Sequence, residues 1–182
     1  MAQSIAVVRG AFNPPTTGHK CVLERLKGFD KILVVPLLAD SHGREMLSYS
    51  KRCEMLKLFV EDTQIPGVEM YAVESEINPH GDPVTVVILL EHLKATFEED
   101  TEITFVIGPE QMQKFPRQRG YERIAGEFNI LVSSERCMVR SEFVREKVCR
   151  NIDITEDTTP AVAAYIANEK LYEDLNHTWT VD

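Results

Sequence analysis

Two features that would direct a chain to a membrane or to nucleic acid are missing from this sequence. No apolar run approaches the ~20 residues that a membrane-spanning helix needs. Lysines and arginines number 20 against 29 aspartates and glutamates, which gives a formal net charge of −9. Proteins that bind nucleic acid generally present a basic face. We therefore expect no nucleic-acid partner and no membrane partner, although a local basic pocket for a nucleotide fits these numbers.

The chain also lacks the cysteine pattern of a zinc or redox site. Its four cysteines are Cys21, Cys53, Cys137 and Cys149, and no two of them show the C-x-x-C spacing of zinc and redox motifs. Three of them lie among apolar residues at helical spacing. We therefore expect four reduced core thiols in a cytoplasmic protein, because cytosolic thiols are kept reduced.

A length of 182 residues and a hydrophobic share of 43% are sufficient for one domain with a proper core. The sequence has no internal repeat, linker or low-complexity segment. The expected organisation is one domain over residues 1–172 and an exposed tail over residues 173–182. Packing of Trp179, the only tryptophan, would hold that tail in place.

Apolar runs alternate with helical periodicity along the whole chain. The pattern predicts strands at residues 5–8, 31–38, 68–73, 102–107 and 129–133. It predicts helices at residues 18–27, 51–62 (with Ser50 as N-cap), 85–97, 110–115, 121–125, 140–150 and 160–171. Such alternation requires right-handed βαβ units. We expect an α/β fold with a doubly wound sheet of about five parallel strands flanked by helices.

In sheets of this kind, ligands bind beyond the carboxyl ends of the strands. The loops at residues 10–17, 39–50 and 108–113 would share that rim. The first of these loops is rich in glycine and proline and leads into a helix whose first turn holds His19. A strand, a Gly/Pro loop and a helix N-terminus form a geometry that suits phosphate, because backbone N–H groups and the helix dipole both favour an anion there.

The same loop carries a specific pattern, G-x-F-x-P-x-T-x-G-H. It is met by Gly10, Phe12, Pro14, Thr16, Gly18 and His19. This pattern resembles the signature of the T/H-x-G-H nucleotidyltransferase superfamily, and within it the chain is most similar to nicotinate or nicotinamide mononucleotide adenylyltransferases. The resemblance implies a Rossmann-like nucleotidyltransferase fold that binds ATP with Mg²⁺ and a pyridine mononucleotide.

The resemblance implies three catalytic residues. His19 would donate to the ATP phosphates, and Thr16 would cap the helix and contact phosphate. The segment VRSEFVR resembles a second family motif, in which Ser141 and Arg145 would hold the β- and γ-phosphates. A guanidinium suits this role because its planar fork donates two hydrogen bonds to phosphate oxygens. Arg140 and Glu142 depart from that motif, and an ordinary exposed arginine paired with a neighbouring glutamate is the alternative for Arg145.

Further ATP contacts follow from the same resemblance. Gly10 and Gly18 would let the backbone approach the nucleotide closely, with Ala11 and Phe12 between them. Gly108 and Glu110 occupy the place of a family G-x-D that holds the ribose. Residues 160–172 resemble the closing helix of these enzymes and add no site residue.

The resemblance also indicates an acceptor site. Its expected residues are Asn13, Arg44, Arg52, Thr85 and Phe115, with Arg52 placed to meet the acceptor phosphate. For His42 and Arg44, solvated loop charges are an equally good explanation. Two departures concern the pyridine ring. Val84 stands before Thr85 where the family has tyrosine, and no tryptophan follows the fourth strand, where Phe115 or Tyr121 would have to substitute.

The expected reaction is adenylyl transfer, in which the 5′-phosphate of the mononucleotide attacks the α-phosphorus of ATP and pyrophosphate leaves. No protein ligand set for a metal is expected, since Mg²⁺ would accompany ATP. One alternative stays within the superfamily, with 4′-phosphopantetheine as acceptor or CTP as donor. Another is a nucleotide-binding module without turnover. The sequence leaves a homo-oligomer, and the choice between nicotinamide and nicotinate, open.

Overall fold

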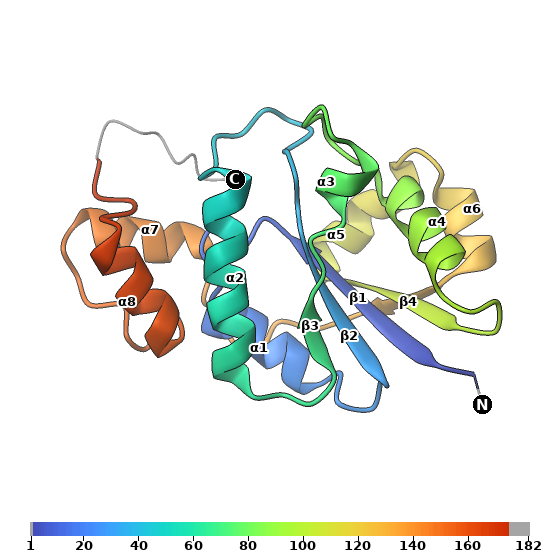
Figure 1. The fold of residues 1–182 in the computed structure, drawn as a ribbon, viewed down its shortest axis with the longest axis horizontal. Helices are drawn as coiled ribbons and strands as arrows, with labels where there is room; N and C mark the ends of the chain where they lie inside the picture. Colours follow the sequence, from blue (N-terminus) through green and yellow to red (C-terminus); the bar gives the residue numbers. More distant parts are fainter. Residues whose placement is uncertain (1, 175–182) are drawn as a thin grey trace.

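The computed structural model describes residues 2–174, which form a five-stranded sheet with helices on both faces (Figure 1). The strands are β1 (Ser4–Gly10), β2 (Lys31–Pro36), β3 (Val68–Met70), β4 (Glu102–Ile107) and β5 (Asn129–Val132). The helices are α1 (Thr17–Glu24), α2 (Tyr49–Thr63), α3 (Glu74–Ile77), α4 (Val86–Thr96), α5 (Pro109–Lys114), the 3₁₀ helix η1 (Phe115–Arg117), α6 (Tyr121–Glu127), α7 (Ser141–Cys149) and α8 (Pro160–Asn168). In this part of the chain no helix combines the length and the apolar character needed to cross a bilayer.

All strand pairs are parallel, and the order across the sheet is β3-β2-β1-β4-β5. This confirms the predicted doubly wound α/β fold. The winding reverses beside β1, which pairs with β2 on one side and β4 on the other. The carboxyl end of β1 is therefore the switch point, where such sheets bind ligands.

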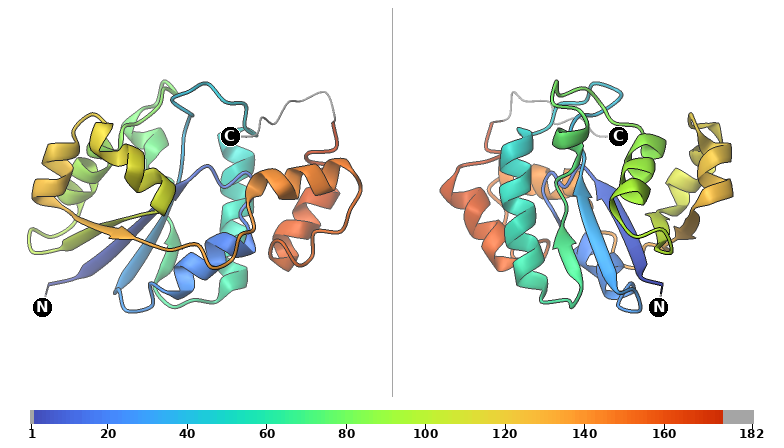
Figure 2. Two further views of the ribbon diagram at one scale, coloured as in Figure 1. Left: turned by 180° about the vertical axis from the view of Figure 1, so that it is seen from behind. Right: turned by 45° about the vertical axis from the view of Figure 1, so that its right-hand side comes forward.

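The central strand builds both halves of the core because successive side chains point to opposite faces. Ala6 and Val8 face a cluster completed by α1, α2, α7 and α8, whereas Ile5 and Val7 face a cluster completed by α4 and α6. Figure 2 shows these helices on the two sides of the sheet. Helices α7 and α8 thus pack on the same face as α1, beside the N-terminal loop.

Several boundaries differ from the sequence-based prediction. Helix α2 begins at Tyr49 with Ser48 as its N-cap, since the Ser48 hydroxyl accepts a hydrogen bond from the Lys51 N–H at 3.3 Å. The prediction of Ser50 as the cap was therefore wrong. Strands β2 and β3 are shorter than predicted, and the four-residue helix α3 was not predicted. The tail prediction and Trp179 fall largely on residues 175–182, which lie outside the described residues.

The most consequential buried side chain of α2 is Arg52, which is 1% exposed. Its guanidinium donates hydrogen bonds to four backbone carbonyls at 2.7–3.2 Å, those of Ala11, Leu37, Leu38 and Leu47. These carbonyls belong to the loops that follow β1 and β2. The expected contact of Arg52 with an acceptor phosphate does not fit this arrangement, because the guanidinium is enclosed and already holds the two loops together.

Replacing this side chain tests its structural role. We expect Arg52→Leu to lower the free energy of unfolding by about 3 kcal/mol or more, because charge-assisted hydrogen bonds are lost and buried carbonyls are left unsatisfied. Chemical denaturation measures the change. Lys57→Leu, on the exposed side of the same helix, is the matched control and should change stability by about 0.5 kcal/mol or less. Equal effects of the two variants would contradict the assignment.

Candidate active site

A cleft of about 420 Å³ opens at the carboxyl edge of the sheet, between the loop after β1, the start of α1 and the segment that leads into α7. It brings together most of the residues that the sequence indicated. Those that line it are Ala11, Phe12, Asn13, Thr16, Gly18, His19, Arg44, Glu110, Ser141 and Arg145. Gly10 lines a second cavity next to it. The two phosphate-type motifs, 125 positions apart in the chain counted from Thr16 to Ser141, therefore line the same cleft.

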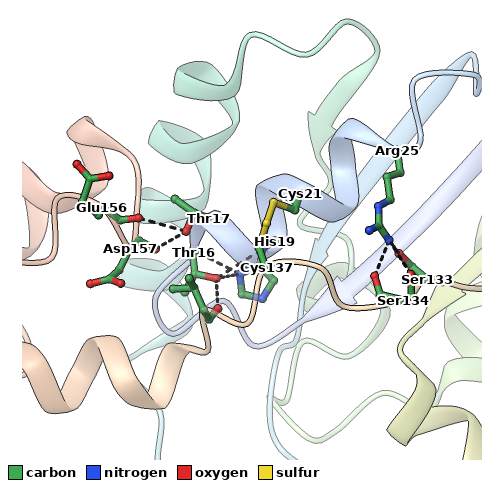
Figure 3. Close-up of a disulfide and its surroundings, with 11 residues drawn as sticks. Thr16, Thr17, His19, Cys21, Arg25, Ser133, Ser134, Cys137, Glu156 and Asp157 are labelled. Carbon is green, nitrogen blue, oxygen red and sulfur yellow. Dashed lines mark hydrogen bonds between the residues drawn. A yellow bond between two sulfur atoms is a disulfide. The ribbon is translucent and has the colours of Figure 1, made fainter.

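Thr16 and His19 cap α1 reciprocally. The His19 N–H donates to the Thr16 hydroxyl at 3.4 Å, and the Thr16 N–H donates to His19 Nδ1 at 2.9 Å (Figure 3). The Thr16 hydroxyl in turn donates to the Val139 carbonyl at 2.8 Å. Because Nδ1 accepts a hydrogen bond, the neutral ring carries its proton on Nε2. The imidazole thereby gains a fixed tautomer with a donor on the other side of the ring.

Much of the helix N-terminus is already used inside the protein. The Thr17 N–H donates to the Asp157 carbonyl at 2.9 Å, and the His19 N–H is taken by Thr16. The expectation that backbone N–H groups at this helix start would serve the ligand therefore applies to fewer groups than the motif suggests. The side chain of His19 becomes the more important donor.

The environment of His19 keeps the imidazole neutral. Its ring packs on Phe12 with 4.8 Å between the ring centroids. Burial lowers the pKa of His19 to about 4, from an ordinary value of 6.5. At neutral pH the side chain is thus an uncharged N–H donor.

This pKa predicts how stability depends on pH. The folded protein disfavours protonation of His19. The contribution of the neutral ring to the free energy of unfolding is therefore complete above pH 6.5 and is lost as the pH falls from 6.5 toward 4. The shift corresponds to as much as about 3 kcal/mol at the acid end. We expect the His19 Hε1 resonance to titrate near pH 4 by NMR. His19→Gln is the control, and its unfolding free energy should fall less between pH 7 and pH 4.5. A midpoint near 6.5 would contradict the burial of this ring.

The start of α7 is fastened to the loop after β1. The Ser141 hydroxyl donates to the Pro14 carbonyl at 2.7 Å, and Arg145 Nη1 donates to the Asn13 carbonyl at 2.8 Å. Both residues also line the cleft. These contacts hold Arg145 in the cleft that His19 also lines, so both side chains are available to a polyphosphate there.

Close backbone contacts explain Gly18, whereas Gly10 has room for a side-chain atom. A Cβ on Gly18 would lie 2.7 Å from the Val139 carbonyl oxygen and 3.0 Å from that of Cys137. A Cβ on Gly10 would lie 3.4 Å from the Phe12 ring. At Gly18 the absence of a side chain allows the segment before α7 to pack on α1. The expected close approach of Gly10 and Gly18 to a nucleotide stays a prediction.

A disulfide joins Cys21 of α1 to Cys137 of this same segment (Figure 3). Their Cα atoms are 6.4 Å apart, although 116 positions separate them in the sequence. Cys53 and Cys149 are free and partly buried. The prediction of four reduced thiols was therefore wrong for two of them, because only the packing of residues 133–140 against α1 brings these sulfurs together.

The disulfide predicts a measurable stability difference. Closing a loop of this length stabilises a fold by about 4–5 kcal/mol in the chain-entropy model, so reduction or Cys137→Ser should lower the free energy of unfolding substantially. A thiol titration of the denatured, unreduced protein should detect two free thiols. Cys53→Ser is the control and should leave the response to reductant unchanged. Four titratable thiols in the unreduced protein would contradict the bond.

The second cavity measures about 270 Å³ and shares Ala11, Arg44 and Gln111 with the cleft. Arg44 is paired with Asp40 at 2.8 Å. Burial acts to raise the pKa of Asp40, but the hydrogen bonds and charge of Arg44 outweigh it and lower that pKa to about 2. Arg44 is therefore held by Asp40 at the junction of the two cavities and is more than a solvated loop charge.

The other expected acceptor residues differ in their positions. Phe115 lines the second cavity but is 1% exposed, with its ring packed on Phe105 and Tyr121. Thr85 caps α4 through its hydroxyl and lines neither cavity, although its neighbours Val84 and Val86 do line the second one. Val84 and Val86, rather than Thr85, therefore face that cavity, and Phe115 contributes almost no exposed surface to it.

Asn13 and the expected ribose contact are engaged within the protein. The Asn13 side chain is 3% exposed and accepts hydrogen bonds from Tyr172 Oη at 2.7 Å and the Leu47 N–H at 3.4 Å. Glu110 is exposed and accepts from Arg140 Nη2 at 3.1 Å. Asn13 therefore holds the loop after β1 in place through its side-chain hydrogen bonds. The expected contact of Gly108 and Glu110 with a ribose stays a prediction.

Sequence reasoning missed one buried ion pair. Arg9 Nε donates to Glu74, which is 0% exposed and also accepts from the Leu38 N–H at 2.8 Å. Arg9 Nη2 donates to the Val84 carbonyl. The available signal was an arginine at the end of an otherwise apolar strand, directly before the glycine of the motif.

The fold is a doubly wound α/β domain, and its histidine, helix start and arginine lie at the switch point, where such sheets bind ligands. The family model described as Cytidylyltransferase-like matches residues 7–175, and the chain belongs to that family.

Three individual relatives share 23% to 32% sequence identity with this chain. A solved structure from Vibrio parahaemolyticus, provisionally named a nicotinate-nucleotide adenylyltransferase, has 32% identity and a TM-score of 0.83, and the match covers 94% of this chain and 96% of that one. A Thermotoga sp. (strain RQ2) relative provisionally named with the same activity is 26% identical over 137 residues, which are 73% of this chain but just under two thirds (66%) of the relative. A phosphopantetheine adenylyltransferase from Thermotoga neapolitana is 23% identical over 94% of this chain and 96% of its own.

Proposed function

We propose that this protein is an adenylyltransferase that moves AMP from ATP to the 5′-phosphate of nicotinamide or nicotinate mononucleotide. The products would be pyrophosphate and NAD or its deamido form. One observation carries the proposal: the cleft with His19 and Arg145 adjoins the second cavity at Ala11. A triphosphate in the cleft and a mononucleotide in the second cavity would bring their phosphates together at that junction. The names of the Vibrio and Thermotoga relatives support the choice of acceptor.

The chemistry needs no nucleophilic side chain, because the acceptor phosphate is itself an anion. Catalysis then consists of positioning and charge stabilisation. The Nε2–H of His19 would donate to the phosphates, and Thr16 would fix the ring that makes this donation. Arg145 would neutralise charge that grows on the leaving pyrophosphate, with Ser141 beside it at the start of α7.

Magnesium fits this site as a companion of ATP. Among the described residues, no cluster of three or more His, Cys, Asp or Glu side chains could hold a metal by itself. Glu110 and Glu135 lie on the cleft but share Arg140 as a partner. Mg²⁺ commonly binds through substrate phosphates, water and one or two carboxylates, so these residues are compatible with it. When bound, it would neutralise triphosphate charge.

We further propose a cytoplasmic location, since ATP is an intracellular substrate. In a reducing cytosol the Cys21–Cys137 bond would be in exchange with the thiol pool. We expect the protein to retain activity when the bond is reduced, because the hydrogen bond from Thr16 to the Val139 carbonyl also holds this segment against α1.

A second acceptor has support of its own. The phosphopantetheine adenylyltransferase of Thermotoga neapolitana aligns along 94% of this chain. An acceptor panel with ATP and Mg²⁺ separates the two readings: nicotinate mononucleotide, nicotinamide mononucleotide and 4′-phosphopantetheine, with CTP as an alternative donor. Dinucleotide product from a pyridine mononucleotide, detected by chromatography and mass spectrometry, is the expected result. ATP binding without product from any acceptor would favour a non-catalytic module.

The contribution of His19 is tested by its removal. We expect His19→Ala to lower kcat/KM about 10²- to 10³-fold, which is the usual loss when one preorganised donor to a developing charge is removed. Pyrophosphate release measures the rate. His92→Ala on α4 is the control, because this histidine lines neither cavity, and its activity should match the unaltered protein. Near-normal turnover of His19→Ala would remove His19 from the mechanism.

A further inference from the structure

One wall residue of the second cavity, Arg9, forms an ion pair with Glu74 that the proposed mechanism does not use. Arg9 ends the apolar run of β1, lines this cavity and has a side chain that is only 13% exposed. Its partner Glu74 is completely buried. Removing two charges from water costs several kcal/mol per ion, and such pairs are often no more stabilising than apolar residues of similar size. Stability alone is therefore a poor explanation for a charged group here.

The partners of Arg9 fix the direction of its guanidinium. Nε donates to Glu74, and Nη2 donates to the Val84 carbonyl. Glu74 is itself fixed, because its second oxygen accepts from the Leu38 N–H. Within the described part of the chain, Nη1 receives no such partner. A guanidinium held by two of its nitrogens presents the third as a preoriented donor.

The remaining walls of the cavity carry the polar side chains of Ser41, His42, Gln111 and Gln118, but its two phenylalanines offer little open face to a ring. Phe105 and Phe115 are 5% and 1% exposed and stack on each other, so they present edges rather than open faces. Arg44 and Asp40 neutralise one another. The single tryptophan of the sequence, Trp179, lies outside the described residues. Recognition by stacking, worth on the order of 1 kcal/mol, is thus poorly provided for by the described walls, whereas a fixed donor is present.

We propose that Arg9 determines acceptor specificity by donating from Nη1 to the oxygen of the substituent on the acceptor's ring, with Glu74 as the positioning residue that aims it. This inference rests on the proposed function. The shared chemistry is an oxygen acceptor on a pyridine ring, which a carboxylate and a carboxamide both supply. Because Glu74 compensates the charge of Arg9, the donor serves a neutral amide as well as an acid.

The first test removes the ring substituent from the acceptor substrate. Steady-state kinetics compare nicotinate mononucleotide, nicotinamide mononucleotide and the pyridine mononucleotide that lacks the ring substituent. We expect kcat/KM for the unsubstituted acceptor to fall at least 10-fold, because a site built to donate a hydrogen bond is left unpaired by it. Equal use of substituted and unsubstituted acceptors by the unaltered protein would overturn the proposal without any variant.

The second test removes the guanidinium of Arg9 from the protein. Arg9→Lys keeps a positive charge beside Glu74 but loses the planar guanidinium, and with it the oriented Nη1 donor. We expect its KM for the substituted acceptors to rise at least 10-fold, its KM for ATP to stay within twofold, and its preference over the unsubstituted acceptor to disappear. Arg123→Lys, on the exposed side of α6, is the matched control and should leave every constant unchanged. A variant that folds and keeps the preference would contradict the role of Arg9.

A third variant addresses Glu74. In Glu74→Gln the charge of Arg9 is no longer compensated, so the preference for the acid over the amide should increase by several-fold, a shift that a purely structural role would not produce. An unchanged ratio in a folded variant would remove Glu74 from the proposal. Absence of dinucleotide from every acceptor would overturn the proposed function and this inference together, whereas turnover without discrimination would overturn the inference alone.

Discussion

The hydrogen bond from the Thr16 hydroxyl to the Val139 carbonyl is the contact on which the site depends, because it closes the two halves of the cleft on each other. One side of it is the capped start of α1, which fixes the His19 ring. On the other side is the segment of residues 133–140, which leads into α7, the helix that carries Arg145. Gly18 permits this contact by leaving room for the Val139 backbone. A change that moved the segment away from α1 would therefore separate the imidazole from the guanidinium while leaving the sheet intact.

The loop after β1 is held by partners from distant parts of the fold. Arg52 binds the Ala11 carbonyl, the Tyr172 hydroxyl binds Asn13, and the Thr158 hydroxyl donates to the Pro15 carbonyl at 2.8 Å. Each partner replaces the regular hydrogen bonds that a loop lacks. The loop is consequently as well ordered by side chains as a strand is by its neighbours, which suits a wall that must present fixed donors.

The sequence was sufficient for the fold and for much of the cleft, because the relevant signals are local. Strands and helices follow from periodicity, and Thr16 and His19 stand three residues apart within one helical turn. Signals were absent where a residue's role depends on a distant partner. Arg52 looks like a ligand for phosphate until α2 is packed and its guanidinium meets four carbonyls. Cys21 and Cys137 have no common spacing, and Glu74 gives no indication that it is buried beside Arg9.

The contact between Asn13 and Tyr172 spans 159 positions and lies next to the hydrogen bond from Arg145 to the Asn13 backbone. During synthesis, the ribosome releases Asn13 long before either partner exists. Most of the sheet can form on the nascent chain, since β5 ends at Val132. The loop after β1 can form these two hydrogen bonds only after Arg145 and Tyr172 have been synthesised, so the order of translation allows the sheet to assemble before this loop is fixed in place.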